Sequence, residues 1–574
     1  MKKAFLMLIA VAISITTFAE VTWELNNGTL TIGGTGTMPS SWGGSGAPWY
    51  SNQNSISTIV IGSGVISVCS EAFYGCNNLG TFTIANGEDA LDFSNGGLPS
   101  LGTCPLLTTV NFGRNITGRL QFQGKTSITT INITGDKVTR IENSAFSSCT
   151  GLTSINLPNT ITFIGSSAFS GCISLTSIAL PNSIHDIASS TFSNTGLYSI
   201  IIPSNINIIH QEAFYGCNSL ATVTIVEEEN ALNFSNGGLQ AFGNCPLTTV
   251  NFGRNITGRL QFQGKTSITT VNITGDKVTR IEESAFSGCT GLTSINLPNT
   301  LTFIGSSAFS GCISLTSIAL PNSIHDITSS TFSNTGLHSI IIPSNINIIH
   351  QEAFYDCSNL VTVTIADEEN ALNFSNGGLQ AFGNCPLTTV NFGRNITGRL
   401  QFQGKTSITT VHITGDKVTR IENSAFSGCT GITTITSENP IPPIAENDCF
   451  YGIDKKHCIV NVPEGSRCAY KKASGWKDFE NIIDGTTYPC EQGVVGVLEN
   501  QLLIYPNPTI RELRIESGEL IIEDIIIYDV FGKIQKIETV KVKDTIDISN
   551  LSTGIYFVKI CTTSGEVIKK ILKK

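Results

Sequence analysis

Apolar residues recur along this chain at spacings that suit a stack of short coils. In residues 166–188, an Ala-Phe pair, a cysteine and a leucine precede four spaced aliphatic positions, giving the set Ala168, Phe169, Cys172, Leu175, Ile178, Leu180, Ile184 and Ile187. Ile178 and Leu180 are two residues apart, so in a strand both point to one face, and Pro181 lacks the N–H that would continue the ladder. The pattern predicts one short strand per coil, with apolar side chains that only stacked neighbours can cover.

The same pattern returns through most of the chain. Residues 144–283 and 284–423 are two copies of a 140-residue sequence that differ at 12 positions, and a partial copy occupies residues 71–143. Each full copy divides into six coils of 23, 23, 22, 29, 23 and 20 residues. We therefore predict a leucine-rich repeat solenoid, a stack of parallel strands with irregular or short helical returns. Because parallel strands advance about 4.8 Å each, the surface of a copy recurs roughly every 29 Å.

The flanks of the coils differ from the coils in composition. Lys2 and Lys3, an apolar run and a Thr-Phe-Ala ending predict a signal peptide cleaved between Ala19 and Glu20, and no later stretch is a transmembrane candidate. Tryptophan occurs only beside the coils, where large aromatic residues can close the open ends of a solenoid. Alternating apolar runs near the C-terminus predict a small β-sandwich. The predicted organisation is a signal peptide at 1–19, an N-terminal cap at 20–55, coils at 56–437, a C-terminal cap at 438–484, a linker at 485–499 and the sandwich at 500–574.

Composition narrows the possible partners. Only 14% of the residues are charged, and the formal net charge is −10. Nucleic-acid binding relies on clustered Lys and Arg, so this balance argues against nucleic acid as the main partner.

The cysteines follow the coils. Eight of the 17 fall at the same coil position, namely Cys76, Cys149, Cys172, Cys217, Cys289, Cys312, Cys357 and Cys429. We interpret them as small buried thiols that fill the turn after the Ala-Phe pair. Three more, Cys104, Cys245 and Cys385, recur in a Cys-Pro-Leu sequence. Cys449, Cys458, Cys468 and Cys490 flank the coils and can form disulfides in an oxidising compartment, with a pairing that the sequence leaves open.

One group of residues is a candidate for ligand binding. The sequence NFGRNITGRLQFQGK begins at residues 111, 251 and 391. We expect its phenylalanines, such as Phe112 and Phe122, to fill the core, and its charged side chains to stay solvated. The predicted binding residues for an acidic glycoprotein or sulfated glycan are Arg114, Arg119, Lys125, Arg254, Arg259, Lys265, Arg394, Arg399 and Lys405.

No group of residues in the sequence has the composition and spacing of a catalytic or metal site. We therefore predict that the protein is not an enzyme and has no cofactor. His185 and His325 share one coil position and His210 and His350 another, and we interpret all four as solvent-facing turn residues without ligand spacing. His412 replaces Asn272 of the preceding copy. The acidic runs at 227–229 and 367–369 can bind calcium or form a solvated loop, and the lack of a DxDxD-type spacing favours the loop.

The coil sequence resembles that of a known family. The Ala-Phe, Cys, LxxIxLP coil, the opening WELNNGTLTIGGTGTMP and the closing NVPEGSRCAYKKASGWKDFENI are similar to the BspA-like leucine-rich repeat proteins, over residues 20–484. Members are surface or secreted proteins of host-associated microbes. The resemblance implies adhesion to extracellular-matrix proteins or to other cells, without naming a ligand.

The last residues resemble a second family, the type A sorting domains of the type IX secretion system of the Bacteroidota. The matching positions are Tyr505, Pro506, Asn507, Pro508, Gly532, Lys533, Leu551, Gly554, Ile555, Tyr556, Lys569 and Lys570. This resemblance implies passage across the outer membrane, then removal of the domain at the 485–499 linker, often with attachment of the protein to surface lipopolysaccharide. An accessory carbohydrate-binding sandwich is the alternative interpretation, and the terminal position and the PNP opening favour sorting.

The sequence thus supports a secreted or surface-attached solenoid that binds host matrix proteins, glycans or neighbouring cells through a repeated surface, without catalysis. The alternative is a structural surface-coat protein that has no specific ligand.

Overall fold

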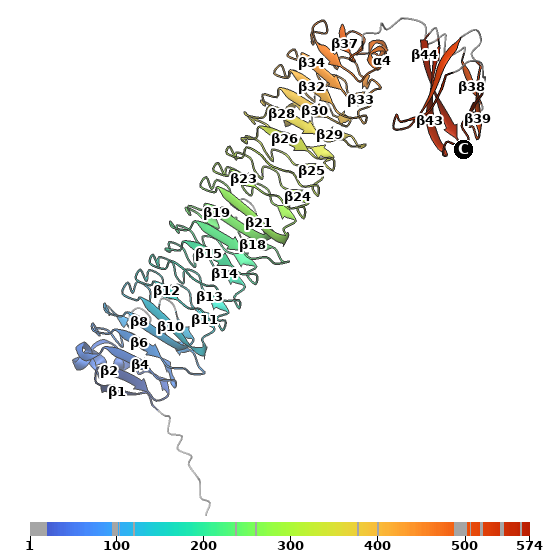
Figure 1. Ribbon diagram of the computed structural model, residues 1–574. Coiled ribbons are helices and arrows are strands. Elements are labelled where there is room, and N and C mark those ends of the chain that lie inside the picture. Colours follow the sequence, from blue (N-terminus) through green and yellow to red (C-terminus); the bar gives the residue numbers. More distant parts are fainter. Residues whose placement is uncertain are drawn as a thin grey trace, which may run out of the picture. The chain divides into compact units, whose positions relative to one another are not determined.

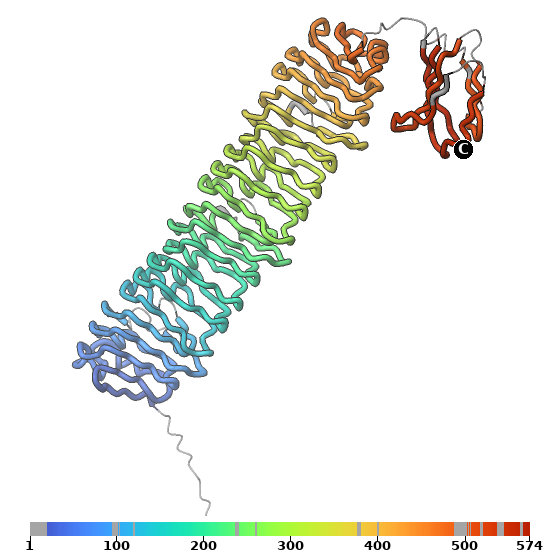
Figure 2. The backbone as a smooth tube through the Cα atoms, viewed as in Figure 1, coloured from blue at the N-terminus to red at the C-terminus, as the bar shows by residue number. Residues whose placement is uncertain are grey.

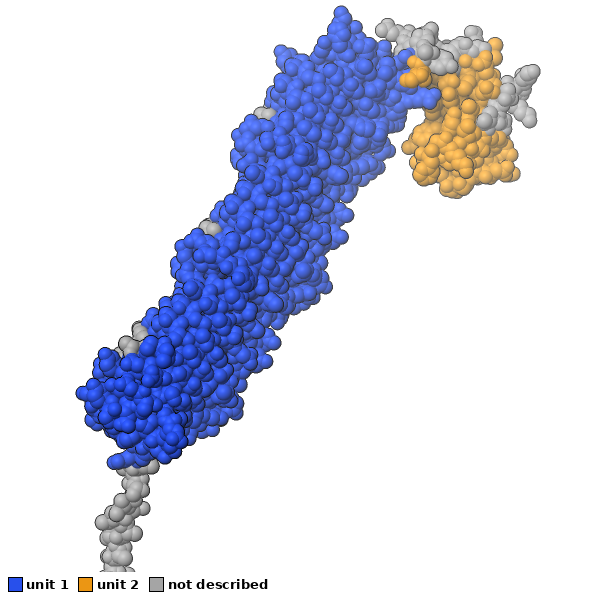
Figure 3. Space-filling model, turned by 60° about the vertical axis from the view of Figure 1, so that its left-hand side comes forward, with its two compact units in different colours: residues 1–484 blue, residues 485–574 orange. Residues whose placement is uncertain are grey.

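The chain forms two compact units in the computed structural model, Met1–Asp484 and Gly485–Lys574, which Figure 3 shows in different colours. The structure describes residues 20–93, 101–102, 104–118, 121–235, 238–258, 261–375, 378–398, 401–486, 502–505, 507–516, 521–539, 545–562 and 565–574. The predicted signal peptide lies outside these residues, and Glu20 is the first residue described.

The first unit is an elongated solenoid in which most coils contribute a strand to one long face of parallel strands (Figures 1 and 2). An antiparallel hairpin opens the first sheet, and each later strand pairs in parallel with the strand of the preceding coil. The strands of this sheet are β1 (Thr22–Asn26), β2 (Thr29–Gly33), β4 (Thr58–Ile61), β6 (Thr81–Ile84), β8 (Thr109–Arg114), β10 (Thr130–Lys137) and β12 (Ser154–Ile155).

Two further sheets continue the same face. The second consists of β15 (Ser199–Ile202), β17 (Thr222–Ile225), β19 (Thr249–Arg254), β21 (Thr270–Lys277) and β23 (Ser294–Ile295). The third consists of β26 (Ser339–Ile342), β28 (Thr362–Ile365), β30 (Thr389–Phe392), β32 (Thr410–Ile413), β34 (Thr434–Ser437), β36 (Ile459–Asn461) and β37 (Asn481–Ile483). Apolar residues alternate inward along these strands, as the spacing of two predicts.

The prediction of a strand in every coil is wrong for the coil used to define the pattern. Ile178 and Leu180 are half-buried against the core but lie outside any strand, so the face is interrupted between β12 and β15. Proline follows the strand position in three successive coils, at Pro158, Pro181 and Pro203. Each proline removes an N–H from the ladder, but β15, which Pro203 follows, still pairs with β17 over four residues, so proline alone does not account for the missing strand. A backbone bond from Tyr198 N–H to the Thr176 carbonyl (3.2 Å) still joins the neighbouring coils.

The returns of the coils also form short parallel sheets, where the prediction allowed only irregular or short helical returns. Their strands are β3 (Gly36–Thr37), β5 (Val65–Ser67), β7 (Leu91–Asp92), β9 (Ile116–Thr117), β11 (Arg140–Ile141), β13 (Phe163–Ile164), β14 (Asp186–Ile187), β16 (Ile208–Ile209), β18 (Leu232–Phe234), β20 (Ile256–Thr257), β22 (Arg280–Ile281), β24 (Phe303–Ile304), β25 (Asp326–Ile327), β27 (Ile348–Ile349), β29 (Leu372–Phe374), β31 (Ile396–Thr397), β33 (Arg420–Ile421) and β35 (Ile444–Ala445). Buried aliphatic residues such as Ile187 and Ile209 lie in these strands, so a second set of sheets closes the core.

Short helices occupy a few turns. The 3-10 turns η1 (Ser40–Trp42), η2 (Gly44–Gly46) and η3 (Tyr50–Ser55) lie near the N-terminal end, and α4 (Arg467–Lys472) lies near the C-terminal end of the solenoid. The helices α2 (Gly238–Ala241) and α3 (Gly378–Ala381) occupy equivalent positions in the two full copies.

A column of phenylalanine rings runs through the core. Phenylalanine rings at the Ala-Phe position of neighbouring coils, where Thr191 replaces the alanine before Phe192, stack at centroid distances such as 5.7 Å between Phe169 and Phe192 and 5.2 Å between Phe214 and Phe242. At one end Trp49 stacks on Phe73 at 5.9 Å, and at the other Trp476 meets the edge of Phe450 at 5.0 Å. Aromatic pairs of this kind add about 0.5–1.5 kcal/mol each beyond their burial, so every coil is stabilised mainly by its two neighbours.

The second unit has two antiparallel sheets, in agreement with the predicted β-rich C-terminal domain. One contains β38 (Leu503–Tyr505), β39 (Glu512–Glu516) and β42 (Thr545–Asp547), and the other β41 (Ile534–Thr539), β40 (Ile522–Asp529), β43 (Gly554–Thr562) and β44 (Gly565–Lys573). Leu513, Ile527 and Val558 belong to its separate hydrophobic core.

Candidate functional site

Each of the three predicted binding patches contains two arginines and a lysine. The first arginine of each patch is buried, which corrects the expectation that it stays solvated. Arg114, Arg254 and Arg394 are at most 1% exposed. The Arg254 guanidinium donates to the Ser204 and Pro203 carbonyls at 2.8 and 3.0 Å, and Arg394 makes the equivalent pair of bonds. Arg114 donates to four carbonyls. Most of these carbonyls lie two coils earlier in the chain, and the Asp89 carbonyl lies one coil before Arg114. The arginines therefore connect coils within the solenoid and present no basic surface.

The lysines of the patch are also buried, at 6–8% exposure for Lys125, Lys265 and Lys405. The Lys265 ammonium donates to the Phe242 carbonyl, and the Lys405 ammonium to the equivalent Phe382 carbonyl. Burial lowers the pKa of all three lysines. The remaining predicted residues, Arg119, Arg259 and Arg399, lie outside the described residues.

The two residue classes predicted to fill the core do so. Phe112 and Phe122 are 4% and 0% exposed, and the eight cysteines of the shared coil position are all 0% exposed. These thiols form a ladder, in which for example Cys172 Sγ donates to the Phe146 carbonyl at 3.2 Å. Of the cap cysteines, Cys449 and Cys458 are free and buried. Cys468 is disulfide-bonded, and Cys490 lies outside the described residues.

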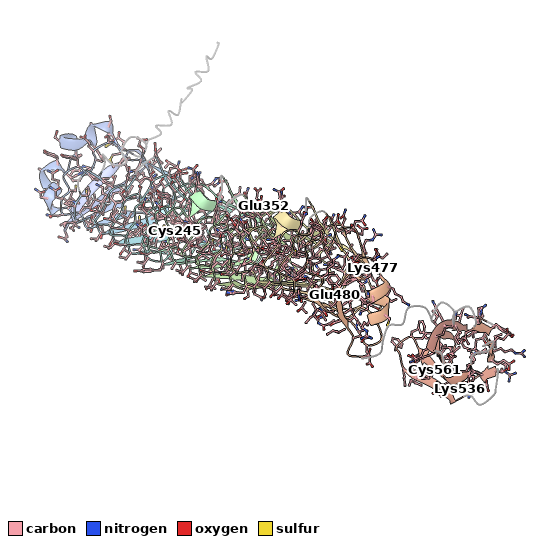
Figure 4. The ribbon with its side chains drawn as sticks, turned by 90° about the horizontal axis from the view of Figure 1, so that it is seen from above. Cys245, Glu352, Lys477, Glu480, Lys536 and Cys561 are labelled. Atoms are coloured by element: carbon pink, nitrogen blue, oxygen red, sulfur yellow. The ribbon has the colours of Figure 1, made fainter. Side chains whose placement is uncertain are left out.

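A polar cavity of about 560 Å³ lies beside α2 in the first full copy. Its lining includes Glu212, Tyr215, Gln240, Asn244, Lys265 and Ser267. Figure 4 labels Cys245, which also lines it, and shows α2 and α3 on the same side of the solenoid. Of the predicted binding residues of this copy that the structure describes, Lys265 is the one that lines this surface cavity.

Hydrogen bonds fix the polar groups of this cavity. Asn244 Nδ2 donates to the Tyr215 hydroxyl at 2.9 Å, and Ser190 Oγ donates to the Glu212 carboxylate at 3.3 Å. Glu212 adopts a φ of 58°, a left-handed conformation that is uncommon for glutamate. The tyrosine remains 38% exposed, so its ring is open to a ligand.

The cavity residues recur, although the sequence analysis did not single them out. In the next copy the same residue types stand at Glu352, Tyr355, Gln380, Asn384, Lys405 and Ser407, and the partial copy has Glu71, Tyr74, Lys125 and Ser127. A signal was present: the Ala-Phe pair is followed by tyrosine at these coils and by serine in most others. Exposed tyrosine at an otherwise serine position marks these coils as different.

The histidines and acidic runs have surroundings typical of a protein surface. His185 and His325 are exposed, whereas His210 and His350 are half-buried, each with Nδ1 at 3.2 Å from a serine hydroxyl. His412 Nε2 lies 3.1 Å from Glu438. Lys277 pairs with Glu229 at 2.9 Å, and Lys417 pairs with Glu369 at 2.5 Å. Within the described residues, no group of three or more His, Cys, Asp or Glu is arranged to hold a metal ion.

The sorting-motif residues hold the C-terminal strand in place. Asn507 Nδ2 donates to the Lys570 carbonyl at 2.9 Å, and Leu572 N–H donates to Asn507 Oδ1 at 2.8 Å. Tyr556 is 5% exposed and its hydroxyl bonds Ser552, while Gly532 takes a φ of 76° in the turn after Asp529. Tyr505, Pro508 and Lys533 are described but Pro506 is not. Asn507 therefore holds β44, which carries Lys569 and Lys570.

Taken together, the stacked parallel coils and the clamped terminal sandwich define an exported leucine-rich repeat protein. Family models agree: the BspA type leucine-rich repeat region matches residues 46–150, 139–261, 255–376 and 373–465, and a secretion system C-terminal sorting domain matches residues 503–574. The chain belongs to the family of proteins with a BspA-type leucine-rich repeat region. Neither matched model is that of an enzyme. The sorting domain assigns the protein to type IX secretion, and so to the cell surface or the medium.

The chain is also similar to several solved structures. A leucine-rich repeat protein from Bacteroides ovatus is 19% identical, with a TM-score of 0.32, over 68% of this chain and 93% of that one. A leucine-rich cell surface protein from Faecalibacterium prausnitzii is 22% identical, with a TM-score of 0.26, over 72% and 92%. The pneumococcal vaccine antigen PcpA is 17% identical, with a TM-score of 0.26, over 74% and 92%. No curated protein sequence matches the chain. Among the described residues, no helix is long and apolar enough to cross a membrane.

Proposed function

We propose that this protein is a multivalent adhesin, a solenoid that binds host matrix proteins, glycans or neighbouring cells through surfaces repeated along its length. The observation that carries the proposal is the recurrence of nearly identical surfaces on one continuous stack. The two full copies have the same return strands, and the rings of Phe169 and Phe192 stack as those of Phe309 and Phe332 do, at 5.7 Å and 2°. Several nearly identical surfaces on one solenoid can bind a clustered or repetitive ligand at several points.

Avidity supplies the mechanism. Once one patch is bound, the next binds as an intramolecular event, which raises overall affinity by about 10²- to 10⁴-fold when the spacing fits. Residues 20–55 and 438–484 serve in this proposal as caps that keep the ends of the stack from joining other chains. Removal of the C-terminal domain near 485–499 would release or attach the solenoid after export.

Copy deletion tests the proposal. Removing residues 284–423 joins Glu283 to Ser424 in register, because the sequence from Ser424 onward continues the same coil that begins at Ser284. We expect saturable binding of the full chain to immobilised matrix glycoproteins or glycans, and a much weaker apparent affinity after deletion of one copy. Saturable binding that is unchanged by deletion would contradict multivalency, and the absence of saturable binding to any partner would favour a structural coat.

A further inference from the structure

The cavity beside α2 suggests a class of ligand for the proposed adhesin, and this inference rests on the proposed function. Lys265 lines this cavity and is 8% exposed, and its ammonium donates a hydrogen bond to the Phe242 carbonyl. An ammonium has three hydrogens to donate. Among the described residues, no carboxylate forms an ion pair with it.

Glu212 also lines the cavity, but its carboxylate accepts a hydrogen bond from Ser190 Oγ at 3.3 Å and, among the described residues, forms no ion pair with Lys265. The Cys245 and Cys289 thiols lie near it, and the hydrogen bond with Cys217 together with burial raises the pKa of Cys245. Burial raises the pKa of Cys289 to about 12, so this thiol is neutral at physiological pH. A buried cation without an anionic partner is costly, and an anion from a ligand would relieve that cost.

The rest of the cavity favours a sugar over a simple anion. The Tyr215 ring is partly open and is held by Asn244, which gives a flat apolar face beside polar groups. Gln240, Thr266 and Ser267 add donors and acceptors that match ring hydroxyls. A volume of about 560 Å³ is large enough for one sugar residue, with room for the bond to the next.

We propose that this cavity binds the terminal carboxylated sugar of a glycan, with the sugar carboxylate against the Lys265 ammonium and the ring against Tyr215. The same residue types at Lys405 and Tyr355 form the second site, and Lys125 and Tyr74 stand at the corresponding positions of the partial copy. The sugar is a sialic acid or a uronic acid, both of which present a carboxylate on a pyranose ring.

The test uses the full chain and immobilised sialyllactose, a glucuronic-acid-terminated oligosaccharide, and lactose as the neutral probe. We expect binding to one or both carboxylated probes, at least about tenfold tighter than to lactose. The probe that binds identifies the source of the carboxylate. The paired substitution Lys265→Met with Lys405→Met should weaken that binding by about 10- to 100-fold, the range for loss of a charged hydrogen bond.

Lys277→Met with Lys417→Met is the matched control. These lysines recur at the same 140-residue spacing and pair with loop carboxylates at the surface, so the control removes the same charge away from the cavity. Tyr215→Leu with Tyr355→Leu is a second cavity variant at exposed positions, which keeps the test valid if the buried lysine variants fold poorly. We expect the control to bind as the parent does and the tyrosine variant to lose several-fold.

The outcomes separate the two proposals. Carboxylated-sugar binding that survives both cavity variants, or that the control loses equally, would overturn the cavity assignment. Copy-dependent binding to matrix proteins together with no preference for carboxylated sugars would overturn the assignment and leave the adhesin proposal standing. No saturable binding of the full chain to any probe or matrix protein would overturn both.

Discussion

The two full copies, residues 144–283 and 284–423, allow the effect of each substitution to be compared within one chain. Of their 12 differences, one lies deep in the core, where Ile161 corresponds to Leu301 and both are 0% exposed. Tyr198 and His338 are an exposed pair, and Gly216, which is buried, corresponds to Asp356, which is exposed. The core accepts a swap of equal volume, while the surface accepts changes of charge and size. We therefore expect the copies to be similar in stability and to differ, if at all, in surface properties.

The largest effect should follow from breaking the phenylalanine column. Phe169 stacks between neighbours at 5.7 Å on both sides, and Phe309 between neighbours at 5.8 and 5.7 Å. Phe169→Ala and Phe309→Ala should each destabilise the local coils by about 3–5 kcal/mol, and by equal amounts, because each leaves the same cavity. Hydrogen exchange of the flanking coils measures this loss, since a long repeat array need not unfold in one step.

Ile161→Leu, which copies the natural change at Leu301, is the control and should cost less than about 1.5 kcal/mol. A loss at Phe169 that differs from the loss at Phe309 by more than about 1 kcal/mol would show that the two copies are not equivalent, against the nearest-neighbour description.

The next largest effect concerns the buried arginines. Arg254→Met and Arg394→Met should each cost about 2–4 kcal/mol, because the carbonyls that the guanidinium bonds are left without a donor. Arg114 donates to four carbonyls where the others donate to two, so Arg114→Met should cost more. The measurement is urea unfolding combined with exchange of the coils around Ser204. Full stability in the methionine variants would mean that water reaches these carbonyls.

The features that the sequence predicted correctly are those that the periodic spacing of residues along the coils determines. The spacing of Ile, Leu and Phe located the inward positions, and the recurrent cysteines were assigned to the core from their coil position alone. Resemblance in the coil and PNP sequences led to both families. These features are local, because a coil contacts chiefly the coils beside it in sequence.

What the sequence did not reveal depends on contacts between coils. Arg254 donates to the carbonyl of Ser204, 50 residues earlier, and no periodic rule signals that a cation will find acceptors at that distance. Lys265 was expected at the surface because lysine is rarely buried, and its partner is a backbone carbonyl that carries no sequence mark. The missing strand at Ile178 likewise has no mark in the coil pattern, which is the same there as in coils that form a strand.

A smaller effect per coil is expected from each unit by which the pH rises above about 9. Burial raises the pKa of the Cys76 and Cys172 thiols to about 12, above the ordinary value of 9.0. Burial favours the neutral form of these thiols in the folded state. The resulting stabilisation of the fold is complete below about pH 9 and is lost as the pH rises from 9 toward 12. Each such thiol should lower the free energy of unfolding by about 1.4 kcal/mol per pH unit in that window.

Unfolding midpoints between about pH 7 and 11 measure the thiol effect, with Cys172→Ala as the control that flattens the slope locally. Near neutral pH the native ladder thiols should resist a thiol reagent, whereas Cys561 of the second unit, which is only partly buried, should react first. Rapid reaction of the ladder thiols in the native state would contradict their burial.

The smallest effect is expected from a residue near the cavity at which the two copies differ. Asp356 Oδ1 accepts a hydrogen bond from Asn384 Nδ2 at 2.7 Å, and Asn384 corresponds to the cavity residue Asn244. The second copy therefore carries an extra negative charge at the position that corresponds to the edge of the cavity, where it would repel a carboxylated sugar and where it occupies an amide donor. We expect Asp356→Gly to raise affinity for the carboxylated probe and Gly216→Asp to lower it, each by roughly two- to fivefold at low salt.

Backbone conformation adds a second contribution at these two positions, and salt separates it from charge. Asp356 has a φ of 59° and Gly216 a φ of 70°, where glycine is favoured, so stability should move in the same direction as affinity by less than about 1 kcal/mol. Added NaCl should shrink the change in affinity through screening and leave the backbone contribution to stability in place. A change in affinity that persists at about 1 M salt, where the screening length is only about 3 Å, would assign the difference between the copies to shape.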